Sequence, residues 1–299
     1  MSERVLHIYL HSPWREAAAA GKVNLFQRMA LALPGWRLDF HPDTPEERHL
    51  APDRGPGLFH MQEPTGPHIL CLRKSYIMPF WRIEAVAERW LFDVALTRFE
   101  PDLIPRDEAA SFVKRWYPKI IGNLSPSREG FVLVPLQGRL SQHRSFQAAS
   151  PLQMVETVLD RVPNKPILAT LHPNERYDPV ELDALNALER RFPRLQVVSE
   201  PTSALLPACD AVVTQNSGVA LLGFFAKKPA VLFAESDFHH IAGSVPRDGT
   251  DAAFSVLDGP SPEFSRYLCW FLRRQAINGG APECEAQIRA RFLRHGWDV

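Results

Sequence analysis

A chain of 299 residues is long enough for two domains of about 130–150 residues each. Lysine plus arginine and aspartate plus glutamate both number 34, so the formal net charge is zero. Proteins that bind nucleic acid usually carry a basic excess, because neutralising phosphates supplies most of their affinity. The balanced charge therefore argues against a nucleic-acid partner.

The four cysteines are far apart in the sequence and form no CxxC pair: Cys71, Cys209, Cys269 and Cys284. They predict neither a zinc knuckle nor a disulfide framework. His239 and His240 are adjacent, and neighbouring side chains on a strand point to opposite faces, so we expect no metal site there either. We expect no bound metal from the sequence.

The opening residues, MSERVLHIYLHSPW, lack the apolar core of a signal peptide, and no stretch approaches the ~20 apolar residues of a membrane helix. Scattered thiols suit a reducing compartment. We expect a cytoplasmic protein and leave open a peripheral association with the inner membrane.

The first half of the chain mixes both kinds of element. Strands are expected at 5–10, 36–40, 57–61 and 68–72, and helices at 23–33, 80–99 and 106–116. The rest of 41–67 is dense in Pro, Gly, Asp and Glu and predicts loops.

The second half alternates short apolar strands with amphipathic helices. Strands are expected at 131–135, 166–171, 195–198, 211–214 and 230–233. Helices are expected at 151–162, 179–192, 202–208 and 218–225, and again at 262–277 and 282–293. Repeated βα units indicate a parallel sheet covered on both faces. We predict an α/β fold of two Rossmann-like domains, with domains at 1–122 and 123–265, divided at a turn-rich segment, and C-terminal helices at 266–299.

Polar residues follow the predicted strands of the second half, where an open parallel sheet binds its ligands. They are Gln137-Gly138, His172-Pro173, Ser199-Glu200 and Gln215-Asn216-Ser217-Gly218. Asn216-Ser217-Gly218 suits a helix N-terminus that binds a phosphate, although a plain helix cap has the same sequence. His172 suits donation to a phosphate oxygen, or a bond to a nearby loop carbonyl.

Residues from Val132 to about His240 resemble the capsule-polysaccharide biosynthesis family of bacterial β-Kdo transferases, which are GT-B glycosyltransferases that use CMP-Kdo. The matching segments are VPLQ (134–137), SPLQMVETVL (150–159), ILATLHP (167–173) and LLPACDAVVTQNSGVALLGFFAKKPAVLF (205–233). The first half matches chiefly in 73–81. The family tends to have an acidic residue where this chain has Ser141.

The resemblance implies a role for each matching residue. His172, held by Pro173, would contact the nucleotide phosphate and help it leave, and Asn216, Ser217 and Gly218 would bind that phosphate. Gln137 would lie beside the nucleotide or its sugar, and Glu200 against the ribose. No cofactor is implied beyond a nucleotide-sugar donor, and no metal, because the helix dipole and basic side chains stabilise the leaving phosphate.

The resemblance also implies that 1–122 is an acceptor-side domain, on which the C-terminal helices pack, and that it supplies a general base. Candidates are His60 and Glu63, together with His11 and Asp53. Arg73 and Lys74 suit attraction of an anionic sugar, or the solvated start of a helix.

We therefore expect transfer of Kdo or a related acidic sugar from a CMP donor to a capsule or other surface-glycan or glycolipid acceptor. Two alternatives stay open. One is a UDP-sugar transferase or epimerase of GT-B fold. The other is a non-catalytic relative that binds glycan or nucleotide during capsule assembly.

Overall fold

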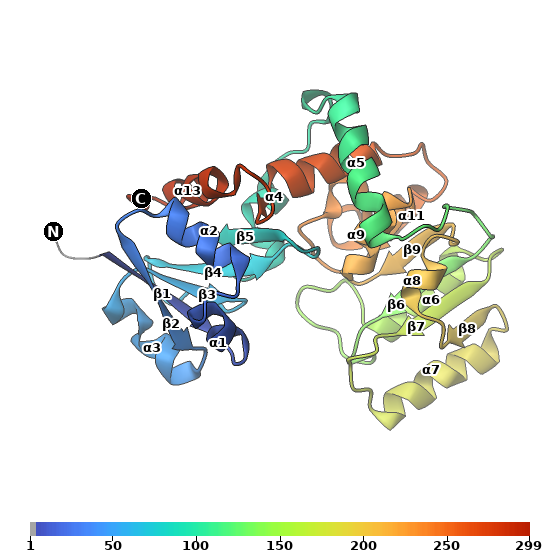
Figure 1. The fold of residues 1–299 in the computed structure, drawn as a ribbon. Coiled ribbons are helices and arrows are strands. Elements are labelled where there is room, and N and C mark those ends of the chain that lie inside the picture. The colour runs from blue at the N-terminus through green and yellow to red at the C-terminus, as the bar shows by residue number, and fades with distance from the viewer. Residues whose placement is uncertain (1–3) are drawn as a thin grey trace. The chain divides into compact units, whose positions relative to one another are not determined.

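Two sheets of six strands each organise the chain, one in each of two units (Figure 1). The computed structural model describes residues 4–299. Unit 1 comprises Met1–Thr97 and Trp270–Val299, and unit 2 comprises Arg98–Cys269. This α/β architecture confirms the predicted fold class.

The sheet of unit 1 has the strand order β2-β1-β3-β4-β5-β12. Four strands are parallel: β1 (Arg4–Leu10), β2 (Trp36–Pro42), β3 (Gly57–His60) and β4 (Ile69–Lys74). At the far edge, β5 (Phe80–Glu84) pairs antiparallel with β4, and β12 (Ile277–Asn278) pairs antiparallel with β5.

The two faces of this sheet differ in composition. Leu6, Ile8 and Leu10 belong to an apolar core that includes residues of α2 (Asn24–Ala32) and α13 (Cys284–Arg294). The alternate residues of β1 face α3 (Pro45–Arg54), where a small buried apolar cluster comprises Tyr9, Ala51, Phe59 and Ile69. Figure 1 shows α2 and α13 on one side of the sheet and α3 on the other.

Two predictions for this unit were wrong. The expected helix at 80–99 is instead β5, a 3-10 turn (Arg89–Leu91) and the short helix α4 (Asp93–Leu96). Its first residues pair antiparallel with β4 and are buried on both faces, and this tertiary pairing overrides a helix-compatible apolar spacing. The stretch 41–67 contains α3 as well as loops. Thr44 caps α3 by accepting the Glu47 N–H at 3.3 Å, with Pro45 in the first turn.

The remaining short helix of unit 1 is α1 (Trp14–Ala19). The predicted helix at 262–277 begins as α12 (Phe264–Leu268), continues as a π-helix (Cys269–Arg274) and ends before β12.

The sheet of unit 2 is entirely parallel, in the order β11-β10-β9-β6-β7-β8. Its strands are β6 (Val132–Leu136), β7 (Ile167–Leu171), β8 (Leu195–Val198), β9 (Ala211–Thr214), β10 (Ala230–Leu232) and β11 (Gly243–Ser244). Taken in chain order, these strands have the arrangement of a doubly wound Rossmann sheet.

The helices of unit 2 connect and flank these strands. They are α5 (Arg106–Ile120), α6 (Pro151–Arg161), α7 (Pro179–Arg191), α8 (Thr202–Leu205), α9 (Gly218–Phe225), α10 (Val245–Asp248), α11 (Thr250–Ser255) and α12. Every strand and helix expected between 131 and 233 is present.

The division between units falls at 97/98 and 269/270, whereas the sequence placed domain boundaries at 122/123 and 265/266. Helix α5 lies against α12 and α9, so residues 98–122 belong with the second sheet. The turn-rich segment at 122–127 therefore marks the end of a helix inside unit 2. Within residues 4–299, no helix has the length and apolar character needed to cross a membrane.

Candidate functional site

The strand order of unit 2 creates a switch point between β6 and β9, where the chain leaves two neighbouring strands toward opposite sides. In open α/β sheets, ligands bind beyond the carboxyl ends of such strands. Thr214 Oγ1 donates a hydrogen bond to Pro135 O at 2.9 Å and so connects the carboxyl ends of β9 and β6. Gln137 and Gln215 follow directly, so both reach this edge.

Both glutamines carry a buried amide oxygen with no hydrogen-bond partner among residues 4–299. Gln215 is only 1% exposed, and its Nε2 donates to Ala149 O at 3.1 Å, which fixes the side chain while its Oε1 stays unsatisfied. An unsatisfied buried acceptor costs about 1–3 kcal/mol. Two such oxygens at one sheet edge indicate a place where a ligand supplies the missing donors.

Helix α9 begins at the same edge. Ser217 has an extended backbone, and its Oγ accepts the N–H of Val219 at 3.3 Å, so it is the N-cap of the helix. Asn216 Nδ2 donates to Glu235 O at 3.0 Å and fixes the preceding turn to the residues after β10. The positive end of α9 therefore lies at the switch point, as an anion site requires. The predicted helix start at Gly218 is confirmed.

His172 follows β7, the strand beside β6, and its side chain is exposed together with Pro173. Its Nδ1 accepts the Asn174 N–H at 3.2 Å, so in the neutral ring Nε2 carries the proton and is a donor. The His172 N–H donates to the Tyr177 hydroxyl at 2.7 Å, and that hydroxyl lies 3.5 Å from Leu136 O. Tyr177, which the sequence did not single out, thus holds this loop against the end of β6.

Glu200 lies after β8, and β7 separates that edge strand from β6. Adjacent strands are about 4.8 Å apart, so two strand spacings separate this residue from the switch point. Its side chain is exposed. Glu200 is therefore the predicted site residue of unit 2 that the fold does not place beside the others.

Basic side chains in the loop between β6 and α6 were missed by the sequence analysis. The loop runs beside the end of β10, because Ala148 N donates to Phe233 O at 2.7 Å. Burial lowers the pKa of Arg144, and the nearby positive charge of Arg139 lowers it further. The negative charge of Glu175 opposes this effect, so basic and acidic side chains lie together near the switch point. The available signal was two arginines and a histidine, His143, within a few residues of a strand end.

Position 141 has a serine instead of an acidic residue, but two carboxylates from elsewhere in unit 2 lie near this loop. The backbone N–H of Ser141 donates to Glu181 Oε1 at 2.9 Å. The carboxylate of Glu175 lies where a Cβ on Gly138 would be, so the absence of a side chain at 138 lets it approach the end of β6. Both carboxylates belong to the segment after β7.

A cavity of about 300 Å³ lies at the opposite, amino-terminal edge of this sheet, beside Val132 and Ala211. Four of its charged lining residues form ion pairs: Lys165 Nζ lies 2.5 Å from Asp210 Oδ2, and Arg161 Nη1 lies 2.6 Å from Asp251 Oδ1. Since ligands of such sheets bind at the carboxyl edge, we do not assign the site there.

Two of the predicted base candidates come together in unit 1. Its strand order has a switch point between β1 and β3, and His11 follows β1 while His60 ends β3. Their rings stack with centroids 5.7 Å apart, and the ring of Trp14 lies 4.5 Å from that of His60. Burial lowers the pKa of His60 to about 4, and His11 also disfavours its charged form. His60 is therefore neutral at neutral pH.

The other candidates of unit 1 have structural partners or different positions. Glu63 Oε2 accepts the N–H of Ala87 at 2.7 Å, and Arg73 Nη1 donates to the Ala87 carbonyl at 2.9 Å. Asp53 is exposed in the last turn of α3 rather than in a loop. Arg73 and Lys74 end β4, so the alternative that they form the start of a helix is excluded.

No protein-family model and no curated protein matches this sequence. Among solved structures, the β-Kdo 2,7 transferase of Thermosulfurimonas dismutans KpsC superposes with a TM-score of 0.53 and 13% identity, covering 90% of each chain. The β-Kdo 2,4 transferase of the same KpsC gives a TM-score of 0.48 and 14% identity, covering 87% of this chain and 88% of the other.

The UDP-GlcNAc 2-epimerase of Neisseria meningitidis bound to UDP-GlcNAc gives a TM-score of 0.42 and 12% identity, covering 97% of this chain and all of the other (100%). At sequence identities this low, structural similarity shows the fold alone, and the superposition with a TM-score of 0.53 is the one that supports it. The chain has the GT-B fold of two Rossmann-like domains.

Proposed function

We propose that this protein is a glycosyltransferase that binds a nucleotide-sugar donor at the β6/β9 edge of unit 2. The observation that carries the proposal is the convergence there of two unsatisfied buried amide oxygens, on Gln137 and Gln215, with the N-terminus of α9. The oxygens accept donors of the nucleotide or its sugar. The helix end, through Asn216, Ser217 and Gly218, receives the phosphate.

In the proposed reaction, the bond between the anomeric carbon and the phosphate oxygen breaks, and a bond from that carbon to an acceptor hydroxyl forms. The leaving phosphate takes a hydrogen bond from His172 Nε2–H, and the end of α9 and the Arg139–Arg144 pair stabilise its charge. These groups do the work that a metal does in other transferases. We propose His60 as the acceptor-side base, because its neutral ring can take a proton, whereas Glu63 is engaged with a backbone N–H.

We further propose that the donor is a CMP-activated acidic sugar of the Kdo class and that the acceptor is a capsule or other surface glycan. Support comes from the sequence resemblance of residues 205–233 and from the shared fold with a KpsC β-Kdo transferase. The basic residues after β6 are consistent with an acidic sugar.

The test is a thermal-unfolding titration of the full chain with CMP, CDP, UMP, UDP and GDP in buffer containing a chelator. A ligand that binds only the folded state raises its stability by mass action. We expect a selective shift with CMP. A shift confined to UDP would replace this proposal by a UDP-sugar transferase or epimerase, and no shift with any nucleotide would contradict it.

A matched pair of variants connects the shift to the site. Gln215→Met removes the buried oxygen with little change in volume, and Gln196→Met makes the same change at an exposed position of β8. We expect only Gln215→Met to lose the CMP shift. Release of free sugar or transfer to an acceptor glycan then separates an enzyme from a non-catalytic binder, which leaves the donor intact.

A further inference from the structure

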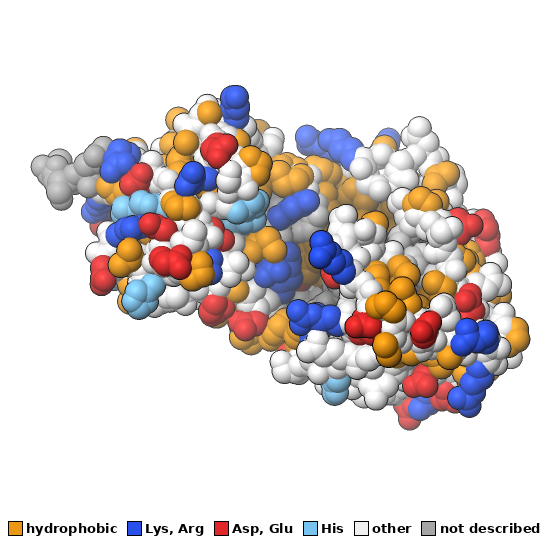
Figure 2. Space-filling model, turned by 90° about the horizontal axis from the view of Figure 1, so that it is seen from below, with side chains coloured by type: hydrophobic (Ala, Val, Ile, Leu, Met, Phe, Trp, Pro, Cys, Tyr) orange, Lys and Arg blue, Asp and Glu red, His pale blue; other side chains and the backbone are white. Residues whose placement is uncertain are grey.

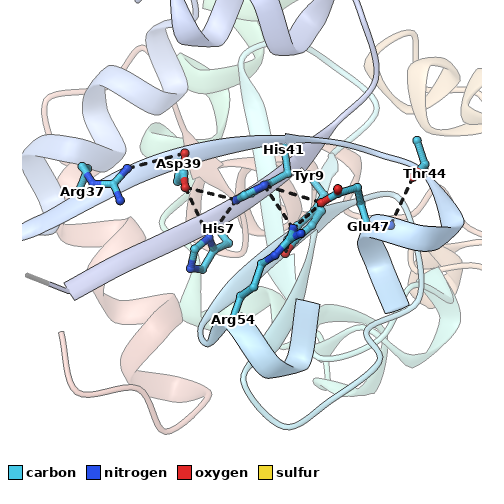
Figure 3. A network of polar contacts seen from close by, with 8 residues as sticks. All are labelled: His7, Tyr9, Arg37, Asp39, His41, Thr44, Glu47 and Arg54. Carbon is cyan, nitrogen blue, oxygen red and sulfur yellow. Dashed lines mark hydrogen bonds and ion pairs between the residues drawn. The ribbon is translucent and has the colours of Figure 1, made fainter. Parts of the chain in front are cut away.

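Three potential metal ligands lie side by side on the α3 face of the unit 1 sheet (Figure 3). In the parallel register of β1 and β2, His7 pairs with Asp39 and Tyr9 pairs with His41. These residues alternate with Leu6 and Ile8, whose side chains belong to the apolar core of the opposite face. The strand pairing itself therefore gathers His7, Asp39 and His41 on one face.

The donor atoms of these three side chains form a compact triangle. His7 Nδ1 lies 2.9 Å from His41 Nε2, while Asp39 Oδ2 lies 3.4 Å from His41 Nε2 and 3.8 Å from His7 Nδ1. Ligand atoms around a tetrahedral ion, each about 2.0–2.1 Å from the metal, are roughly 3.3 Å apart. The triangle thus has the size of three corners of one coordination tetrahedron.

We propose that His7, Asp39 and His41 bind one divalent transition-metal ion of the Zn²⁺ type, with water as the fourth ligand. Two imidazoles and one carboxylate suit Zn²⁺ or Co²⁺, whereas Mg²⁺ and Ca²⁺ prefer oxygen ligands. The side chains are 13%, 39% and 18% exposed, in that order, so an ion reaches them from solvent. Figure 2 shows histidine side chains at the surface of unit 1, among acidic and basic ones.

The surroundings of His41 support this assignment. Glu47 Oε2 lies 3.8 Å from His41 Nδ1, and the Thr44 cap of α3 holds Glu47 in the first helical turn. When Nε2 binds a metal, the ring proton resides on Nδ1, and a carboxylate beside it orients the ring and strengthens the ligand. Arg54 now lies 3.3 Å from Nδ1 and is also paired with Glu47, so on metal binding it retains Glu47 as its partner.

The charged side chains around the proposed ligands balance one another. The charges of Asp39 and Glu47 are balanced by Arg37 and Arg54. The ion would therefore add charge to a neutral cluster rather than to a positive one.

In a second cluster of potential metal ligands, the donor atoms already have protein partners. Glu84, Asp93 and His295 also lie close together, but Asp93 Oδ2 is 2.6 Å from Arg294 Nε. His295 Nε2 is hydrogen-bonded to Ile83 O at 3.1 Å, which occupies its donor atom. Those groups already have protein partners, and we assign no ion to them.

The role of the ion follows from its position. Strand β2 is the edge of the sheet, and on this face four of the described residues, Tyr9, Ala51, Phe59 and Ile69, form a small buried apolar cluster. An ion bridging β1 and β2 would hold the edge strand where apolar packing is sparse. The site lies along the strands rather than at the switch point of His11 and His60, so the role is structural. This inference is independent of the proposed function.

The experiment uses the full chain, free of any histidine tag and treated with chelator. Calorimetric titration with Zn²⁺, Co²⁺ and Mg²⁺ is combined with thermal unfolding and with the visible absorption of bound Co²⁺. We expect one Zn²⁺ or Co²⁺ per chain, a raised unfolding temperature and no response to Mg²⁺. Absence of one-to-one Zn²⁺ binding would overturn the proposal.

Four variants define the site. His41→Ala and Asp39→Asn should abolish the binding, the latter with almost no change in shape. Glu47→Gln should weaken it by roughly 10–100-fold, the usual effect of losing a carboxylate behind a ligand. His49→Ala, which removes an exposed histidine of α3, is the control and should bind like the parent. Unchanged binding in Asp39→Asn and in a folded His41→Ala would place the ion elsewhere.

Discussion

Ser217 is the N-cap of α9, and we propose that it also contacts the donor phosphate. Its Oγ accepts the Val219 N–H at 3.3 Å, and α9 is a buried helix with Leu221 and Phe224 in the core. Replacing an N-cap serine by alanine costs about 1 kcal/mol, whereas replacing it by glycine costs a few tenths. In a unit of this size, 1 kcal/mol lowers the unfolding temperature by roughly 2–4 °C.

The assay compares Ser217→Ala and Ser217→Gly with the parent in thermal unfolding, alone and with CMP. We expect the stability order parent, Gly, Ala. Both variants lose the hydroxyl, so both should bind CMP more weakly, by about tenfold for one lost hydrogen bond to a charged group. Equal stability of the Ala and Gly variants would refute the capping role. Parent-like CMP affinity in both would remove Ser217 from the phosphate site.

Three further changes test other parts of the structure. In Gly243→Ala the new Cβ overlaps the backbone carbonyl of Ala253, so the free energy of unfolding should fall by about 3 kcal/mol or more. The control Gly66→Ala should leave it almost unchanged. A parent-like urea midpoint in Gly243→Ala would contradict this prediction. The pKa of His60 is about 4 in the folded state and 6.5 in the unfolded state. Its contribution to the free energy of unfolding should therefore be fully present above pH 6.5 and be lost as the pH falls toward 4. Between about pH 7 and pH 5 we expect the free energy of unfolding, measured by urea titration, to fall by about 1–2 kcal/mol through His60, and His60→Gln should reduce this fall. The same pH dependence in the variant and the parent would show that His60 is not responsible. His172→Gln should keep its stability within about 0.5 kcal/mol but weaken CMP binding by roughly tenfold, whereas the control His68→Gln should change neither stability nor CMP affinity. Unchanged CMP affinity in His172→Gln would contradict a contact between His172 and the phosphate.

Sequence patterns were most informative in unit 2, for a physical reason. Each strand there is a short apolar run buried in a parallel sheet, and polar caps mark where helices begin. Ser150 and Gln153 form a reciprocal capping box at α6, and Asp178 accepts the Val180 N–H at 2.8 Å at α7. These signals are local, so the sequence alone located both ends of most elements.

Unit 1 was harder to predict because its decisive interactions are not local. The segment Phe80–Glu84 becomes a strand only through pairing with β4, and apolar Trp81 and Ile83 fit a helix as well. By contrast, α3 had readable signals, Thr44 followed by Pro45 and two glutamates, which the density of Pro and Asp obscured.

The sequence predicted those residues of the candidate site that directly follow a strand. His172 and Asn216–Gly218 were expected at the carboxyl edge and are there, whereas the unsatisfied oxygens of Gln137 and Gln215 emerge only from burial. The proposed metal ligands could not be found by spacing, since His7 and His41 are 34 positions apart and meet only through the register of β1 and β2.

The serine at position 141 illustrates the difference between a missing motif residue and a missing chemical group. The resemblance predicts an acidic residue in the loop after Gln137, and its absence would leave that end of β6 without a carboxylate. The fold, however, brings Glu181 to the backbone of Ser141 at 2.9 Å and Glu175 to the surface of Gly138. Because β7 is the immediate neighbour of β6, the segment that follows β7 can supply what the loop after β6 lacks. The departure at 141 is therefore no argument against a carboxylate at this edge, and it directs attention to Glu175 and Glu181 as the residues that would carry out that role.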